Sequence, residues 1–149
     1  MKKRSFYAIV ILSVALILMS ILCIMVQREQ SELRQAIDTT YKESFLRILD
    51  SMHQMEDPSF GEEEKQMLSA RDTGYGFNLR TLQFTTSFAH HADFYTISQI
   101  LDEATGTDAI YTLTCSEELY DTLMQLYEND FQDEDLLEKA RTLLEAAID

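Results

Sequence analysis

Residues 6–26 read FYAIVILSVALILMSILCIMV and contain no Asp, Glu, Lys or Arg. At about 1.5 Å per residue, a helix of this length spans roughly 30 Å, the thickness of the hydrocarbon core of a bilayer. Thirteen of these residues are Leu, Ile, Val or Phe, and each favours insertion by about 0.3–0.6 kcal/mol near the bilayer centre. The stretch therefore predicts a transmembrane helix at 6–26.

The ends of this run favour an anchor that is not cleaved. A secretory signal peptide has an apolar region of about 7–15 residues followed by a small-x-small cleavage site. Here the run is longer and ends in Ile24, Met25 and Val26 without such a site. Leu22 also stands before Cys23, where a lipoprotein signal would carry a small residue. Cleavage after the run is the alternative interpretation.

The charges around the run predict its orientation. Three basic residues, Lys2 to Arg4, precede it without an acid among them, whereas bases and acids alternate after it. By the positive-inside rule, we expect a cytoplasmic tail at 1–5 and an extracytoplasmic domain at 27–149, held at the cell membrane by one span.

The predicted outer segment is strongly acidic. All 26 acids lie in 27–149, with only nine of the twelve Lys and Arg residues. Such a surface repels nucleic acid and anionic lipid headgroups, so we expect no nucleic-acid partner. Basic proteins, cations or a cationic wall polymer fit it better, and the plainest interpretation is a solvated acidic face. The length suits one small domain.

The two cysteines do not predict a disulfide within the chain. Cys23 lies in the predicted membrane helix and Cys115 in the outer domain, so they should not meet. Cys115 is most simply a small buried apolar residue, with an intermolecular disulfide as the alternative.

The segment after the membrane helix has a helical pattern. Gln27 to Glu56 contains no Gly or Pro, so the membrane helix should continue through it as a single rod. Its apolar residues recur at spacings of three and four, and they are Leu33, Ile37, Tyr41, Phe45, Ile48, Met52 and Met55. We expect this face to pack within its own domain, with a coiled-coil dimer as the alternative.

A second helix should begin soon after the rod ends at Asp57-Pro58. Ser59 and Glu62 have the spacing of a capping box, which predicts a helix start near Phe60. The sequence Gly74-Tyr75-Gly76 predicts an interruption or bend in this helix.

Residues 77–89, FNLRTLQFTTSFA, fit two interpretations. The preferred one is a helix buried on two sides, with Phe77, Phe84 and Phe88 forming the second buried stripe. The alternative is an α+β fold with strands near 77–88 and 109–114, where aromatic and β-branched residues are common.

The C-terminal part predicts three further helices. The third carries Phe94, Ile97, Leu101 and Ala104, and Gly106 should supply a left-handed residue after its end. The fourth follows Ser116 as N-cap and carries Leu119, Leu123, Leu126 and Tyr127; the fifth follows Asp133 as N-cap and carries Leu136, Leu137, Ala140, Leu143, Leu144, Ala147 and Ile148. The fold class expected from the whole chain is mainly α: a transmembrane helix that continues into a small extracytoplasmic helical bundle.

Metal binding is not favoured. His90 and His91 are adjacent, so their side chains diverge by about 100° on a helix, and His53 is distant in sequence. The acids Asp130, Asp133, Asp135 and Glu138 offer oxygen ligands, but the segment 128–138 lacks the glycine that lets an EF-hand loop turn around calcium. A turn between two helices with a solvated acidic start explains these acids better.

Nothing in the sequence marks an enzyme. There is no Gly-x-Ser-x-Gly, and no basic or histidine neighbour activates Cys115. Carboxylate pairs could arise from the abundance of acids alone. We therefore expect no catalytic, cofactor-binding or metal-binding residue, and no cofactor.

A resemblance to a known family rests on two groups of residues after the anchor. The first is Ala36-Ile37-Asp38-Thr39-Thr40-Tyr41 with Ser44-Phe45 and Leu49, and the second is Leu113-Thr114 with Ser116-Glu117-Glu118-Leu119-Tyr120 and Leu123. With the anchor, they resemble the helical N-terminal region of YpeB-type spore-germination proteins. The resemblance implies an all-helical exported domain that partners a cortex-lytic hydrolase.

The sequence leaves three functional hypotheses. The first is a single-pass, non-enzymatic scaffold or interaction subunit of a cell-envelope assembly, bound to the bilayer through 6–26 and to an envelope protein through 27–149. The second is an extracytoplasmic sensor of a ligand or cation, which should have a pocket near 74–76 or 128–138. The third is the accessory role in spore germination. The oligomeric state stays open.

Overall fold

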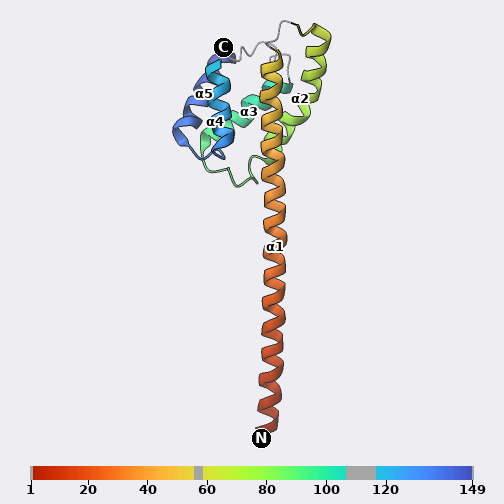
Figure 1. Ribbon diagram of the computed structural model, residues 1–149. Helices are drawn as coiled ribbons and strands as arrows, with labels where there is room; N and C mark the ends of the chain where they lie inside the picture. The colour runs from red at the N-terminus through yellow and green to blue at the C-terminus, as the bar shows by residue number, and fades with distance from the viewer. Residues whose placement is uncertain (1, 56–58, 107–116, 149) are drawn as a thin grey trace. The chain divides into compact units, whose positions relative to one another are not determined.

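The computed structural model describes residues 2–55, 59–106 and 117–148, and the side chains from residue 11 onward. These residues form five helices, α1 (Lys2–Met55), α2 (Glu62–Leu82), α3 (Ala92–Gly106), α4 (Glu117–Glu128) and α5 (Glu134–Ile148), and none of them lies in a strand (Figure 1). The mainly α prediction is confirmed. The alternative strand near 77–88 is wrong, because α2 continues to Leu82 and turns follow it. The preferred helix over 77–89 is correct only as far as Leu82. The alternative strand at 109–114, the Ser116 cap and Cys115 lie outside the described residues.

The chain divides into two compact units, Met1–Ala36 and Ile37–Asp149. The described part of the first unit is the N-terminal part of α1, and its apolar side chains from Ile11 to Val26 are exposed. By length and composition, α1 can cross a membrane, and it is the one described helix that can. It has no break between Lys2 and Met55, as the absence of Gly and Pro after the apolar run predicts.

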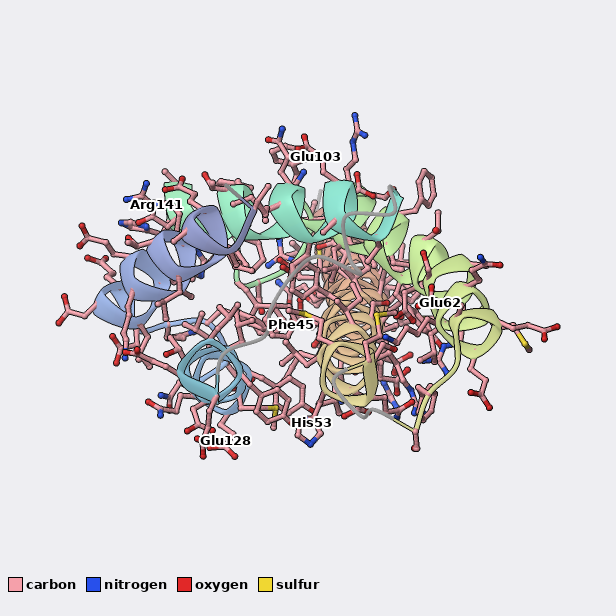
Figure 2. All side chains as sticks on the ribbon, turned by 90° about the horizontal axis from the view of Figure 1, so that it is seen from above. Phe45, His53, Glu62, Glu103, Glu128 and Arg141 are labelled. Carbon is pink, nitrogen blue, oxygen red and sulfur yellow. The ribbon has the colours of Figure 1, made fainter. Side chains whose placement is uncertain are left out.

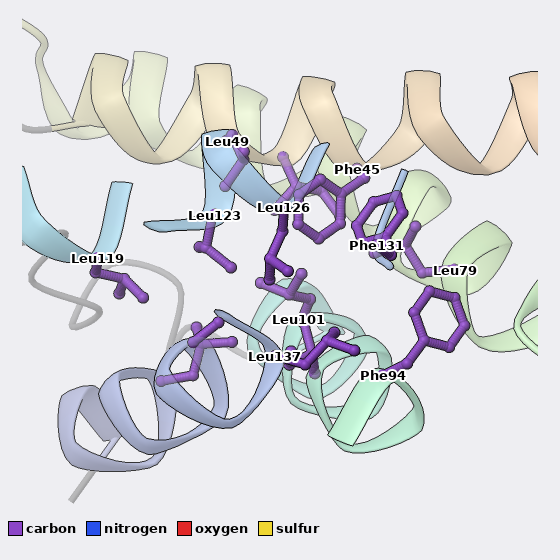
Figure 3. Packing of buried hydrophobic residues seen from close by; sticks show 14 of the residues in the cluster. Phe45, Leu49, Leu79, Phe94, Leu101, Leu119, Leu123, Leu126, Phe131 and Leu137 are labelled. Carbon is purple, nitrogen blue, oxygen red and sulfur yellow. The ribbon is translucent and has the colours of Figure 1, made fainter. Parts of the chain in front are cut away.

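The second unit packs α2 to α5 around residues 41–52 of α1. Side chains from all five helices meet in its core (Figure 3). Four of the seven apolar residues predicted to face the domain are buried, namely Tyr41, Phe45, Ile48 and Met52; Ile37 and Met55 are partly buried, whereas Leu33 is exposed. Seen from above, Phe45 lies among the helices, and Glu62, Glu103, Glu128 and Arg141 lie toward the outside (Figure 2).

Helix α2 is continuous through 74–76, so the predicted interruption is wrong, whereas a bend there stays a prediction. Gly76 is buried where α2 meets α3. A Cβ placed on Gly76 would clash with Oγ1 of Thr105 and would lie 3.0 Å from Cα of Asp102. This glycine therefore permits the close approach of two helices and does not act as a breaker.

The helix ends differ in part from the predictions. The N-cap of α2 is Gly61, whose N–H donates to Oε2 of Glu64 at 2.7 Å. The expected start at Phe60 with a Ser59–Glu62 box is thus two residues too early. Gly106 is the last residue of α3 and has no positive φ. The Asp133 cap is confirmed, because its Oδ1 accepts the N–H of Leu136 at 3.1 Å.

The turn between α4 and α5 places an aromatic ring in the core. Asp130 and Phe131 have φ of 52° and 57°, the left-handed region that non-glycine residues rarely adopt. A backbone hydrogen bond from Phe131 to the carbonyl of Leu126, 2.9 Å long, closes the end of α4 in the manner of a Schellman motif. The Phe131 ring then packs edge-on against Tyr41 and Phe45, with centroids 5.5 and 4.9 Å away.

The two glycines of α2 provide a matched pair of substitutions. No atom lies within 4 Å of a Cβ on Gly74, so Gly74→Ala should raise the free energy of unfolding by up to about 1 kcal/mol through helix propensity. Gly76→Ala should lower it by about 1–3 kcal/mol, because the new methyl group meets the backbone of α3. Chemical denaturation of both variants measures this, and equal shifts would contradict the packing of α2 on α3.

Candidate functional site: the exposed face of α2

One side of α2 carries apolar and small residues that the rest of the second unit leaves uncovered. They lie at spacings of three and four on a single helical stripe, and we call them the α2 face: Met67, Ala70, Gly74, Phe77, Thr81 and Phe84. The exposed fractions of Met67, Phe77 and Phe84 are 70%, 63% and 71%. Phe84 stands two residues after the end of α2, and its neighbour Gln83 keeps helical dihedral angles.

The α2 face corrects the prediction of a helix buried on two sides. Phe88 is buried as expected, but Phe77 and Phe84 are not. The buried residues of α2 are Leu68, Asp72, Gly76 and Leu79, which lie on the opposite side of the helix. The buried side meets α3 through Gly76. Next to it, the amide nitrogen of Asn78 donates to Oγ of Ser44 of α1 at 3.2 Å.

The surroundings of the α2 face contain basic residues. Arg71 and Arg80 flank it on either side, and the one acid between residues 67 and 84 is Asp72, on the buried side. Nη2 of Arg71 donates to Oγ of Ser51 at 2.7 Å, and Nη1 of Arg80 lies 3.3 Å from Oδ2 of Asp102. These contacts hold both guanidinium groups beside the stripe. The α2 face is therefore free of acids in a domain that is otherwise strongly acidic.

Phe84 is held in place although it is exposed. Its ring stacks on Tyr95 of α3, with centroids 5.1 Å apart and planes 25° apart. The hydroxyl of Tyr95 in turn donates to the carbonyl of Ala89 at 3.3 Å. A fixed aromatic side chain loses less conformational entropy when a partner covers it, which is typical of residues that contribute strongly to binding.

Asp72 is a buried acid that the sequence interpretation did not single out. Its side chain is fully buried, Oδ1 lies 3.3 Å from Nε of Arg71, and Oδ2 has no hydrogen-bond partner among the described residues. Burial raises the pKa of Asp72, although Ser51 and Arg71 act in the opposite direction. Asp72 lies four residues after Leu68 and seven before Leu79, so all three share one helical face. This spacing in the sequence could have identified Asp72 as a buried acid.

The histidines do not converge. The ring of His53 lies 5.1 Å from that of Tyr120, with the two planes tilted by 32°, and Nδ1 of His91 lies 3.3 Å from Oδ2 of Asp93. The other oxygen of Asp93 lies 2.8 Å from Nε of Arg141. Within the described ranges, no three His, Cys, Asp or Glu side chains are grouped so that they could hold a metal ion.

The acids between 128 and 138 have separate roles. Oδ1 of Asp130 lies 2.6 Å from Nζ of Lys42, which also lies over the ring of Tyr127. Asp133 caps α5, whereas Asp135 and Glu138 border a shallow hollow of about 330 Å³ along α5.

A larger hollow lies between α3 and α5. It has a volume of about 460 Å³ and is lined by Thr96, Gln99, Ile100, Glu103, Glu145 and Ile148. The sensor hypothesis placed a pocket near 74–76 or 128–138. Residues 74–76 lie within α2 and do not line this hollow, and the hollow bordered by Asp135 and Glu138 is open to solvent.

Comparison of the chain with protein-family models, with curated proteins and with solved structures finds no match. The likeness to YpeB-type proteins therefore stays a prediction, and the α2 face stands on its own geometry.

The buried carboxyl of Asp72 should make stability depend on pH. In the folded protein, the pKa of Asp72 lies above the ordinary value of 3.8. The protonated carboxyl therefore makes its full contribution to the free energy of unfolding below pH 3.8, and this contribution is lost as the pH rises through the raised pKa. Asp72→Asn keeps the shape without an ionisable proton. Its free energy of unfolding relative to wild type should increase from about pH 4 to about pH 8 in urea denaturation.

Asp121 on α4 is exposed, so Asp121→Asn is the matched control and should not reproduce this gain. An identical pH dependence in wild type and Asp72→Asn would show that the carboxyl at 72 is not held in an apolar setting.

Proposed function

We propose that this protein is a single-pass, membrane-anchored, non-enzymatic interaction subunit of a cell-envelope assembly. The proposal is based on the α2 face, where Met67 and Phe77 of α2 and Phe84, just beyond its end, are exposed to solvent. Contiguous apolar patches of this kind on a folded domain are typical of protein–protein interfaces.

A partner that covers the α2 face would gain free energy from the burial of its large side chains. Burying an exposed Phe or Met side chain contributes about 1.5–3 kcal/mol. The three large residues of the α2 face could together supply several kcal/mol, before the entropic cost of association is subtracted. The same helix already buries its opposite side in the domain core, so a partner can cover the α2 face without unfolding α2.

The proposed setting follows from the charges and the apolar run. Residues 6–26 would lie in the bilayer, 1–5 on the cytoplasmic side and 27–149 outside. An acidic outer domain would bind neither nucleic acid nor anionic headgroups. The resemblance to YpeB-type proteins implies one kind of partner, a cortex-lytic hydrolase.

Site-specific photo-crosslinking in native membranes tests the proposal. A benzophenone amino acid in place of Phe77 should give adducts of defined mass that stay with alkali-washed membranes. The matched control is Ile148 of α5, which is 47% exposed and lies outside the α2 face. Failure to form adducts at 77, or equal adducts at 77 and 148, would contradict an interface on the α2 face.

A further inference from the structure

We infer that the hollow between α3 and α5 binds a Lys or Arg side chain from a basic segment of a partner protein. The hollow shares no residue with the α2 face, so this inference goes beyond the proposed function and names a second point of contact. Its volume of about 460 Å³ lies within the range of about 300–1,000 Å³ that is typical of ligand sites. Its lining combines carboxylates with apolar side chains, which suits an amphipathic cation.

The lining carries two carboxylates and no Lys or Arg. Glu103 comes from α3 and Glu145 from α5, whose side chain is 48% exposed. Neighbours orient both groups, because the amide nitrogen of Gln99 donates to Oε1 of Glu103 at 2.8 Å and Nη1 of Arg141 donates to Oε1 of Glu145 at 3.3 Å. A carboxylate has about four lone-pair sites, so an added cationic donor does not need to displace these neighbours.

Arg141 does not neutralise the surroundings of the hollow. Its Nε lies 2.8 Å from Oδ1 of Asp93, which is closer than its contact with Glu145. One guanidinium is thus shared by two carboxylates, and Glu103 adds a third negative charge. The site therefore keeps a net negative charge even with Arg141 beside it.

The ends of two helices add to this negative potential. Glu103 lies in the last turn of α3, and Glu145 and Ile148 lie in the last turn of α5; neither last turn contains a basic residue. The last carbonyl groups of a helix carry a negative partial charge, which a nearby cation stabilises. A cation supplied from outside the chain would fill this role in the hollow.

The apolar part of the lining selects the kind of cation. Ile100 is partly buried and Ile148 is 47% exposed. Lys and Arg side chains bury their aliphatic stems along such surface while the charged end stays at the rim. A metal ion instead needs several converging oxygen ligands, and the carboxylates of this hollow come from separate helices.

The charge of the whole chain favours a basic partner at this place. The net charge is −14, so a basic segment is attracted at long range and a local pair of carboxylates then fixes where it binds. Single exposed ion pairs are weak, so the affinity for a short segment should be low and should fall as salt is added.

Fluorescence anisotropy of a dye-labelled hexalysine peptide with the full chain in non-ionic detergent tests the inference. The double variant Glu103→Gln with Glu145→Gln should raise the dissociation constant about tenfold, because two ion pairs are lost. Ile148→Ser should raise it about threefold, because the lysine stem loses apolar contact.

The matched control is Glu117→Gln with Glu128→Gln on α4, which changes the net charge of the chain by the same amount. Both residues are exposed, and Glu128 lies on the opposite side of the domain from Glu103 (Figure 2). This control should change the dissociation constant less than twofold. Equal weakening by the two double variants would show diffuse attraction to an acidic surface and would overturn the site.

Two further outcomes would overturn it. One is a wild-type chain that does not bind hexalysine at low salt. The other is binding of a chitosan oligosaccharide in place of the peptide, which would assign the hollow to a cationic wall polymer and not to a protein segment.

The two proposals fail separately. Phe77→Ser should leave the affinity for hexalysine unchanged, so binding through the hollow without adducts at position 77 would overturn only the α2 face. Adducts at 77 without hexalysine binding would overturn only the hollow. An adduct at position 148 with a mass of its own, lost in the Glu103→Gln and Glu145→Gln variant, would come from the hollow and would support it.

Discussion

The second unit depends on the burial of Tyr41 of α1. Its side chain is fully buried, its ring lies 5.1 Å from that of Phe94, and its hydroxyl lies 2.6 Å from Oγ of Ser98. Because the Ser98 hydroxyl donates to the carbonyl of Phe94, Tyr41 donates to Ser98. Burial raises the pKa of Tyr41, so the phenol stays protonated and this bond stays intact. Helix α1 is thus a component of the core as well as the candidate membrane span.

This arrangement explains why α2 has one free side. Helices α1 and α3 contact α2 from the core side, as Asn78 against Ser44 and Gly76 against Thr105 illustrate. No described helix lies beyond the α2 face, which therefore presents Phe77 and Phe84 to solvent. In the proposed function, α1 would anchor the protein in the membrane and also contribute to the domain core, and α2 would bind the partner. The acidic surface elsewhere would restrict where that partner can bind.

Periodicity in the sequence predicted much of the fold but not the site. The spacings of three and four identified α1, α3 and α5, and Asp133 was correctly assigned as a cap. The same spacing could not say which side of α2 is covered, because Phe77 and Leu79 are both apolar and burial is decided by neighbours distant in sequence. Gly76 was misinterpreted for the same reason: its role depends on Thr105, 29 residues later. The buried Asp72 could have been found from its register with Leu68 and Leu79.

Residues 41–52 of α1 belong to the core of the acidic domain. Native-state hydrogen exchange of the full chain can measure this, because exchange reports the free energy of opening at each amide. We expect the amides of 41–52 and of 97–104 in α3 to exchange through the same global unfolding, with equal free energies. Exchange of 41–52 at a much lower free energy, while 97–104 stay protected, would show that the domain folds without α1.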